Sequence, residues 1–169
     1  QMAKAMGHRV FATARTEDKC RACEKIGAER CINSTTENFA EYIRAATNGK
    51  GVDVILDIIG AAVLDKEIDC LADEGRLVLI AYLGGRLGTV DLAQIVHRQL
   101  MVTGSTLRPR SNEFKAEIAR NLQKHIWPLI DEGKIKPVIY KVFPLAEAML
   151  AQKLMQSNTH FGKIVLQVI

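Results

Sequence analysis

The stretch His8-Arg-Val-Phe-Ala-Thr-Ala-Arg-Thr-Glu-Asp-Lys19 decides how the fold of this chain is interpreted. Its first part, up to Ala14, is suited to a buried strand, and the part from Arg15 onward opens a helix. Thr16 suits the capping position before that helix, and the two acidic residues after it complement the positive end of the helix dipole. The stretch therefore predicts a strand that runs directly into a helix.

The same alternation of strand and helix continues along the chain. The expected strands are residues 8–14, 30–33, 53–59, 76–82 and 100–107, and the expected helices are residues 16–26, 37–47, 64–72 and 91–98. Strands this continuously apolar, separated by helices, are typical of a parallel sheet covered on both faces. The predicted fold class is therefore α/β, with a doubly wound parallel sheet of the Rossmann type. Only the end of a helix precedes residue 8, so we expect the sheet to lack its first strand.

The regular alternation of apolar strands and short helices ends at Arg108-Pro-Arg110. The chain then predicts a longer amphipathic helix that Pro128 interrupts, followed by a strand, a helix and a final strand. These four elements are expected at residues 112–130, 136–142, 146–156 and 163–168. We place a domain boundary near Pro109, between residues 1–109 and residues 110–169.

The end of the strand at Ala14 carries information about the ligand. In doubly wound sheets an acidic residue at the end of the second strand binds the free ribose hydroxyl of NAD, whereas a basic residue there accommodates the extra phosphate of NADP. Here the strand ends Ala14-Arg15, with no carboxylate before Glu17. Arg15, Thr16 and Lys19 are therefore predicted to bind the 2′-phosphate of NADP(H), helped by the start of the helix. The alternative is an ordinary, solvated helix start.

Composition and charge narrow the class of protein further. The chain has 169 residues, 48% of them hydrophobic and 25% charged, which indicates a folded protein of one domain, or one domain and part of another. Its net charge of +4 is dispersed, and no apolar run approaches the ~18 residues of a membrane-spanning helix, so neither nucleic acid nor a membrane is expected as a partner. Four cysteines without zinc-site spacing predict free thiols, no metal site and a cytoplasmic location.

Several short segments, taken in order, resemble the carboxyl-terminal half of the zeta-crystallin-like quinone oxidoreductase family, within the medium-chain dehydrogenase/reductase superfamily. They are Ala12-Thr-Ala14, Lys25-Ile-Gly-Ala28, Gly51-Val-Asp-Val-Ile-Leu-Asp57, Gly75-Arg-Leu-Val78, Lys134-Ile-Lys-Pro-Val138, Phe143-Pro-Leu145 and Gly162-Lys-Ile-Val-Leu166. The resemblance implies a zinc-independent, NADPH-dependent reductase of quinones or α,β-unsaturated carbonyls. It further implies that residues 1–109 are an NADP-binding domain truncated at its start, and that residues 110–169 return to a substrate domain.

The resemblance also implies further cofactor contacts. Ser34 would border the adenosine, and Lys163 would reach the phosphates. Ile80, Ala81, Tyr82 and Leu83 would line the nicotinamide, and the backbone of Ser105, Thr106 and Leu107 would approach its carboxamide. Each has a plainer alternative: a turn serine, a surface lysine, a tyrosine at the core boundary and an edge strand. The family commonly has Gly or Ser in place of Arg15, and Tyr or His in place of Ser34.

No catalytic residue is assigned, because the chain shows no nucleophile–base pair and no carboxylate pair at useful spacing. We expect residues 1–169 to be inactive without a substrate domain. The edge of the strand at Leu100–Leu107 is predicted to form a homodimer. The alternatives are an enoyl reductase domain of a larger synthase, a non-catalytic NADPH-binding module and, more distantly, a methyltransferase.

Overall fold

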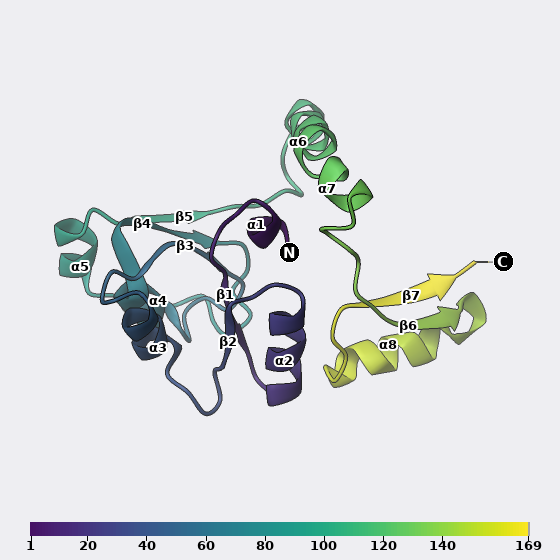
Figure 1. Ribbon diagram of the computed structural model, residues 1–169, viewed down its shortest axis with the longest axis horizontal. Coiled ribbons are helices and arrows are strands. Elements are labelled where there is room, and N and C mark those ends of the chain that lie inside the picture. Colours follow the sequence, from purple (N-terminus) through teal and green to yellow (C-terminus); the bar gives the residue numbers. More distant parts are fainter. Residues whose placement is uncertain (169) are drawn as a thin grey trace. The chain divides into compact units, whose positions relative to one another are not determined.

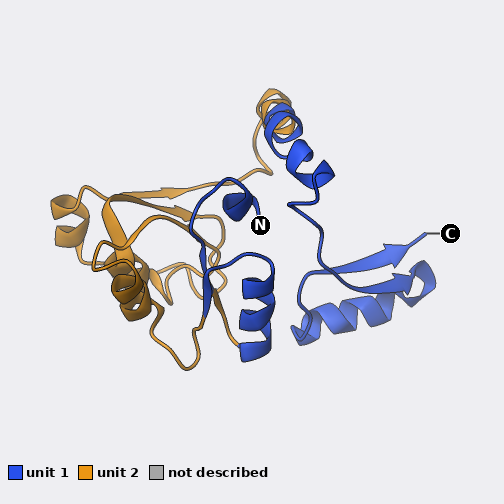
Figure 2. Ribbon diagram, in the orientation of Figure 1, with its two compact units in different colours: residues 1–12, 16–31, 120–169 blue, residues 13–15, 32–119 orange. Residues whose placement is uncertain are grey.

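A computed structural model describes residues 1–168 of the chain, which form two compact units (Figure 1; Figure 2). The first unit contains residues 1–12, residues 16–31 and the chain from residue 120 onward. The second unit contains residues 13–15 and 32–119. This division follows the compactness of the chain, and the functional boundary near Pro109 stays a prediction.

The second unit contains a three-stranded parallel sheet, in the order β3 (Val52–Asp57), β4 (Leu71–Leu79) and β5 (Met101–Gly104). In its register Ile55 lies beside Leu77, and Leu77 lies beside Val102. The parallel sheet predicted from the apolar runs is therefore confirmed. Among residues 1–168, β3 pairs only with β4 in this sheet, which fits a doubly wound sheet without its first strand.

Three helices pack in the second unit: α3 (Phe39–Ala46), α4 (Leu64–Cys70) and α5 (Leu92–His97). Helix α4 contacts α3, β4 and α5. The core contains the buried side chains of Ile68, Leu71, Leu77 and Leu100, with further apolar residues packed around them. Each such side chain removed from water contributes about 1.5–3 kcal/mol, so this cluster holds α4 on the sheet.

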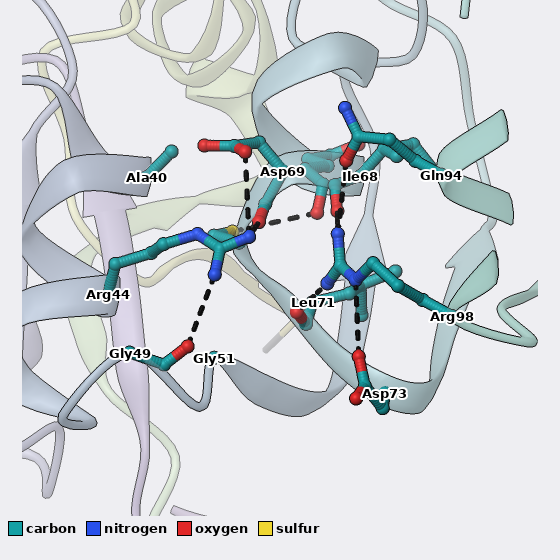
Figure 3. Close-up of polar contacts among 12 residues, drawn as sticks. Ala40, Arg44, Gly49, Gly51, Ile68, Asp69, Leu71, Asp73, Gln94 and Arg98 are labelled. Atoms are coloured by element: carbon teal, nitrogen blue, oxygen red, sulfur yellow. Dashed lines mark hydrogen bonds and ion pairs between the residues drawn. The ribbon is translucent and has the colours of Figure 1, made fainter. Parts of the chain in front are cut away.

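Two arginines bind the carboxyl end of α4, where the last carbonyl groups of a helix lack partners within the helix (Figure 3). Arg44 donates to the carbonyl oxygens of Asp69 and, at 3.1 Å, of Gly49. Arg98 donates to the carbonyl oxygens of Leu71 and, at 3.0 Å, of Ile68. Cationic side chains here also complement the negative end of the helix dipole, so both arginines stabilise α4.

The first unit contains α1 (Met2–Ala5), α2 (Glu17–Lys25) and most of the carboxyl-terminal segment. In that segment β6 (Ile139–Pro144) pairs in parallel with β7 (Lys163–Gln167). The short helix η1 (Leu145–Glu147) and α8 (Ala148–Ser157) connect them, and α8 contacts both strands. The side chain of Gln1 donates to the carbonyl of Lys136 at 2.9 Å and accepts from its amide at 2.7 Å, which ties the amino terminus to this segment.

A two-stranded sheet of β1 (Phe11–Ala14) and β2 (Arg30–Asn33) contributes residues to both units. The amide of Glu29 donates to the carbonyl of Val10 at 2.7 Å, and the amide of Ser34 donates to the carbonyl of Ala14 at 2.9 Å. These bonds advance in the same direction along both strands, so the strands run parallel, as a doubly wound fold requires.

Several predicted element ends were wrong. Strand β4 ends at Leu79 and not at Tyr82, and β5 is limited to Met101–Gly104, so Ser105–Leu107 follow the strand and do not close it. The helix expected over residues 112–130 is interrupted as predicted, although the break between α6 (Asn112–His125) and α7 (Trp127–Asp131) falls before Pro128. Pro128 lies in the first turn of α7, where its missing N–H is tolerated. None of the helices in residues 1–168 has both the length and the apolar character that crossing a membrane requires.

Candidate cofactor-binding site

The three strands β3, β4 and β5 end at one edge of their sheet, where ligands of doubly wound folds bind. The amide of Ile80, just after β4, donates to the carbonyl of Asp57 at the end of β3, at 2.8 Å. The amide of Ser105, just after β5, donates to the carbonyl of Leu79 at 2.9 Å. The structure therefore brings together two of the segments predicted to line the nicotinamide, those that begin at Ile80 and Ser105.

The segments 57–61 and 80–85, called here the paired turns, are joined by further backbone hydrogen bonds. The amides of Leu83 and Gly84 donate to the carbonyls of residues 58 and 59 at 3.1 and 2.7 Å, and the amide of residue 61 donates to the carbonyl of Gly85 at 2.9 Å. Gly60 has a φ of +80°, and a Cβ there would lie 2.6 Å from the oxygen of Gly85. Only glycine fits this approach, so the two turns hold each other in one conformation.

The paired turns present apolar side chains to solvent. Ile80 is 44% exposed, Tyr82 68% and Leu83 78%. Exposed apolar surface at the carboxyl ends of parallel strands is a surface on which a flat heterocyclic ring can pack. After β5, the Thr106 carbonyl accepts from the Arg110 side chain at 3.2 Å, and Leu107 remains 55% exposed.

Two buried carboxyl groups lie in contact at the first of the paired turns. Asp57, 4% exposed, accepts from the amides of Ile59 and Gly60 at 2.7 and 2.6 Å. Glu67 of α4, 5% exposed, forms a side-chain hydrogen bond with Asp57. Burial, and secondarily the charge and hydrogen bond of Asp57, raises the pKa of Glu67 to about 8. Glu67 is therefore mostly protonated at neutral pH and donates to Asp57.

From the sequence, no role was assigned to Glu67 or Asp57 and no carboxylate pair was found at useful spacing, so this contact was missed. A signal for Glu67 was present in the helical pattern. Leu64, Ile68 and Leu71 recur at the spacing of one helix face, and Glu67 falls three residues after the first of them. A carboxyl group on the apolar face of a helix predicts burial, although it does not identify the partner.

The residues predicted to bind the 2′-phosphate are only partly available for it. Arg15 is exposed just after β1, and its guanidinium forms no hydrogen bond or ion pair within residues 1–168. Thr16 caps α2 and accepts from the amide of Lys19 at 3.4 Å. The Lys19 ammonium group donates to the carbonyl and side-chain oxygens of Asn158, at 2.5 and 3.3 Å. Lys19 thus fastens α2 to the end of α8, and Arg15 is the less constrained cation.

Ser34 and Lys163 also have local structural roles. The Ser34 hydroxyl donates to the Ala14 carbonyl at 3.2 Å, and the neighbouring Thr35 hydroxyl donates to the Arg15 carbonyl at 3.1 Å. These bonds connect the ends of β1 and β2 beside Arg15. Lys163 is exposed at the start of β7 in the first unit, where its amide donates to the Val138 carbonyl at 2.7 Å.

The thiols of Cys20, Cys23 and Cys31 form a cluster between α2 and β2. Cys31 forms side-chain hydrogen bonds with both other cysteines. Burial raises the pKa of the Cys31 thiol far above its usual range and also raises that of Cys23. Within residues 1–168, no three His, Cys, Asp or Glu side chains are arranged to hold a metal ion.

Comparison with curated proteins reveals relatives that span the whole chain. A 2-haloacrylate reductase of a Burkholderia species is 36% identical over 97% of this chain and 49% of its own length. The squalestatin tetraketide synthase clz2 of Cochliobolus lunatus is 32% identical over 98% of this chain, which corresponds to 7% of that synthase. The chain thus spans about half the length of the first reductase.

Solved structures share the fold over nearly the whole chain. An NAD-dependent alcohol dehydrogenase has a TM-score of 0.81 and 35% identity, over 99% of this chain and 46% of its own. A mycobacterial quinone oxidoreductase has a TM-score of 0.82 and 26% identity, over 98% and 51%. The sequence profile described as zinc-binding dehydrogenase matches residues 1–124. The chain therefore belongs to the zinc-binding dehydrogenase family and corresponds to the carboxyl-terminal portion, with its Rossmann-like NAD(P)-binding fold, of a medium-chain dehydrogenase/reductase.

Proposed function

We propose that the protein containing this chain is an NADPH-dependent reductase of quinones or α,β-unsaturated carbonyls that works without zinc. The observation that carries the choice of coenzyme is the strand end Ala14-Arg15, with an exposed guanidinium and no carboxylate where NAD-binding folds place one. An Arg guanidinium is planar and offers several donors, which suits a phosphate. Thr16 adds the capped start of α2.

The nicotinamide end of the coenzyme is proposed to lie on the paired turns. Ile80, Ala81, Tyr82 and Leu83 supply apolar surface, and Ser105, Thr106 and Leu107 supply backbone groups at the same sheet edge. The bound coenzyme supplies the hydride, and these residues orient it and exclude water. Ser34 is assigned to the adenosine, and Lys19 and Lys163 to the phosphates, with Lys19 first leaving Asn158.

The substrate class is supported by two relatives of different specificity. The Burkholderia relative reduces 2-haloacrylate, an α,β-unsaturated acid, and the mycobacterial one is a quinone oxidoreductase. Both substrate types accept a hydride at an electrophilic carbon. We further propose a cytoplasmic homodimer that pairs through the β5 edge, because all of Met101–Gly104 is exposed.

The test joins the amino-terminal half of the Burkholderia reductase to residues 1–169 and measures coenzyme oxidation. We expect NADPH consumption with 1,2-naphthoquinone or with an enone, and much weaker consumption with NADH. Preference for NADH would contradict the choice of coenzyme. Lack of turnover in a folded, NADPH-binding protein, across panels of both substrate types, would contradict the proposed reaction.

The match to the tetraketide synthase favours a second candidate, an enoyl reductase domain of a multidomain synthase. Such a domain also delivers a hydride to an α,β-unsaturated carbonyl, but its substrate is attached to a carrier domain. The sequence on either side of residues 1–169 separates the two candidates. Acyltransferase or carrier domains would favour the synthase, and a single preceding substrate domain would favour the free-standing reductase.

A further inference from the structure

Asp57 controls the shape of the first of the paired turns. It lies at the end of β3, and its two carboxylate oxygens accept from the amides of Ile59 and Gly60 at 2.7 and 2.6 Å. Since both oxygens act as acceptors, the turn is fixed while this carboxyl group stays in place. Any movement of this carboxylate would release two backbone amides together.

The shape of the first turn is transmitted to the second. The Ile59 carbonyl accepts from the amide of Gly84 at 2.7 Å, and the carbonyl of Asp57 itself accepts from the amide of Ile80 at 2.8 Å. The segment from Ile80 to Gly84 carries the exposed apolar side chains proposed to contact the nicotinamide. Asp57 is therefore a positioning residue for that surface, although Asp57 itself is buried and only 4% exposed.

Glu67 decides whether Asp57 has a neutral or a charged neighbour. Oxygen Oε2 of Glu67 is buried and accepts no hydrogen bond from residues 1–168. Two other ionisable groups matter here: Asp57 contacts Glu67, and the Cys70 thiol donates to the Glu67 carbonyl at 3.6 Å. Arg44 and Arg98, from the neighbouring elements, bind other residues of α4 and not Glu67. An ionised Glu67 would thus be a second buried anion without a compensating cation.

We propose that a proton held by Glu67 and donated to Asp57 locks the paired turns, so that the nicotinamide surface is ordered only while Glu67 is protonated. The link to the nicotinamide rests on the proposed function, whereas the lock itself does not. Ionisation of Glu67 has its midpoint near pH 8, because burial raises its pKa to about 8. Cys70 stays neutral across this range, since burial raises its pKa to about 12.

The test measures amide exchange in the reductase that carries this chain, at pH 7, 8 and 9, by NMR or mass spectrometry. Protection factors are used because they remove the pH dependence of chemical exchange. At Ile59 and Gly60 they should fall by up to tenfold between pH 7 and pH 8 and then level off, because the locked and the open turn differ in bound protons only below the pKa of about 8. At Val165, inside β7 of the first unit, they should stay constant.

The variant Glu67→Gln supplies the matched control, because an amide N–H still donates to Asp57 but cannot ionise. In this variant the protection of Ile59 and Gly60 should be independent of pH, and so should the affinity for NADPH. In the unsubstituted protein the dissociation constant for NADPH should rise about tenfold between pH 7 and pH 9. In Glu67→Gln it should stay constant.

The possible outcomes are distinct. Constant protection at Ile59 and Gly60 in the unsubstituted protein, or an equal loss in Glu67→Gln, overturns the lock. If Glu67→Gln does not fold, the comparison of Ile59 with Val165 of the first unit in the unsubstituted protein decides alone. A protein that binds no NADPH at pH 7 contradicts the proposed function and the nicotinamide link, while the exchange data still decide whether Glu67 locks the turns.

Discussion

A Cβ atom on Gly51 would lie 2.4 Å from the carbonyl oxygen of Leu71. This approach brings the chain before β3 against the junction of α4 and β4, and Gly51 also has a φ of +86°. The β3–β4 register contains an irregularity just after this point, between Val52 and Val54. The start of the central parallel pair is therefore built around one residue without a side chain.

The variant Gly51→Ala should unfold more easily than the unsubstituted protein by at least ~2 kcal/mol, because the new methyl group meets backbone that cannot move aside. Gly49→Ala is the matched control. Gly49 has a similar φ of +82°, but nothing lies within 4 Å of a Cβ there. The Gly49→Ala variant should lose only about 1 kcal/mol of unfolding free energy. Urea unfolding followed by circular dichroism gives both values, and equal losses would refute the steric explanation.

Arg98→Ala should destabilise the second unit by about 2–3 kcal/mol, because it leaves the carbonyls of Ile68 and Leu71 without this donor. The Arg98 side chain is only 17% exposed, so water replaces it poorly. Arg21→Ala removes an exposed ion pair with Asp18 and should cost less than about 0.5 kcal/mol. Thermal unfolding of the two variants makes the comparison, and similar shifts in the midpoint would contradict a special role for Arg98.

Arg15→Ala should weaken the binding of NADPH by about 1.5–3 kcal/mol and leave the binding of NADH nearly unchanged, since a charge-assisted contact to the 2′-phosphate is lost. Lys25→Ala, at the far end of the same helix, removes an equal charge and should affect neither coenzyme. Titration calorimetry with both coenzymes measures the difference. Equal losses for NADPH and NADH in Arg15→Ala would show that Arg15 does not contact the phosphate.

Lys19→Ala separates the two roles of that residue. Its ammonium group donates to Asn158, so the variant should lower the stability of the first unit by about 0.5–1.5 kcal/mol whether or not a coenzyme is present. If Lys19 also binds phosphate, NADPH affinity should fall further than the stability loss explains. Unfolding measured with and without NADPH checks this. No change in stability would contradict the observed anchor between α2 and α8.

Stability itself should depend on pH through Glu67. Its pKa is raised from 4.5 in the unfolded chain to about 8 in the folded protein, so the folded state keeps a proton that the unfolded state loses. The free energy of unfolding should therefore fall from pH 4.5 to about 8 and then level off, by up to about 5 kcal/mol in total. Glu67→Gln should lack this component. A Glu67→Gln curve parallel to that of the unsubstituted protein would rule it out.

Much of the architecture was accessible from local sequence. Thr16 was predicted as a helix cap, and its side chain accepts from the amide of Lys19. Gly27 directly follows the helix expected over residues 16–26, and it has a φ of +118° two residues after α2 ends. Caps, turns and apolar periods depend on neighbouring residues, so they are readable before the chain is folded.

The parallel arrangement could be predicted from the apolar runs and the helices between them. A strand that is buried on both faces of a parallel sheet is apolar at nearly every position. Exact strand ends did not follow. The segment Ile80-Ala-Tyr82 is as apolar as the strand before it, but the amides of Leu83 and Gly84 that follow it bond with the turn after β3. The residue at which a strand stops pairing depends on which backbone groups lie within hydrogen-bonding distance. The hydrophobic periodicity of the sequence does not contain this information.

The sequence by itself determined the order of strands and helices, the family and the basic end of the strand at Ala14. Only the tertiary structure decided that Glu67 touches Asp57 and that Lys19 is bound to Asn158. Both pairs join residues from separate elements, 10 and 139 positions apart. Contacts of this kind arise when helices pack, and they set burial and hydrogen bonding, which in turn decide whether a carboxyl group holds its proton.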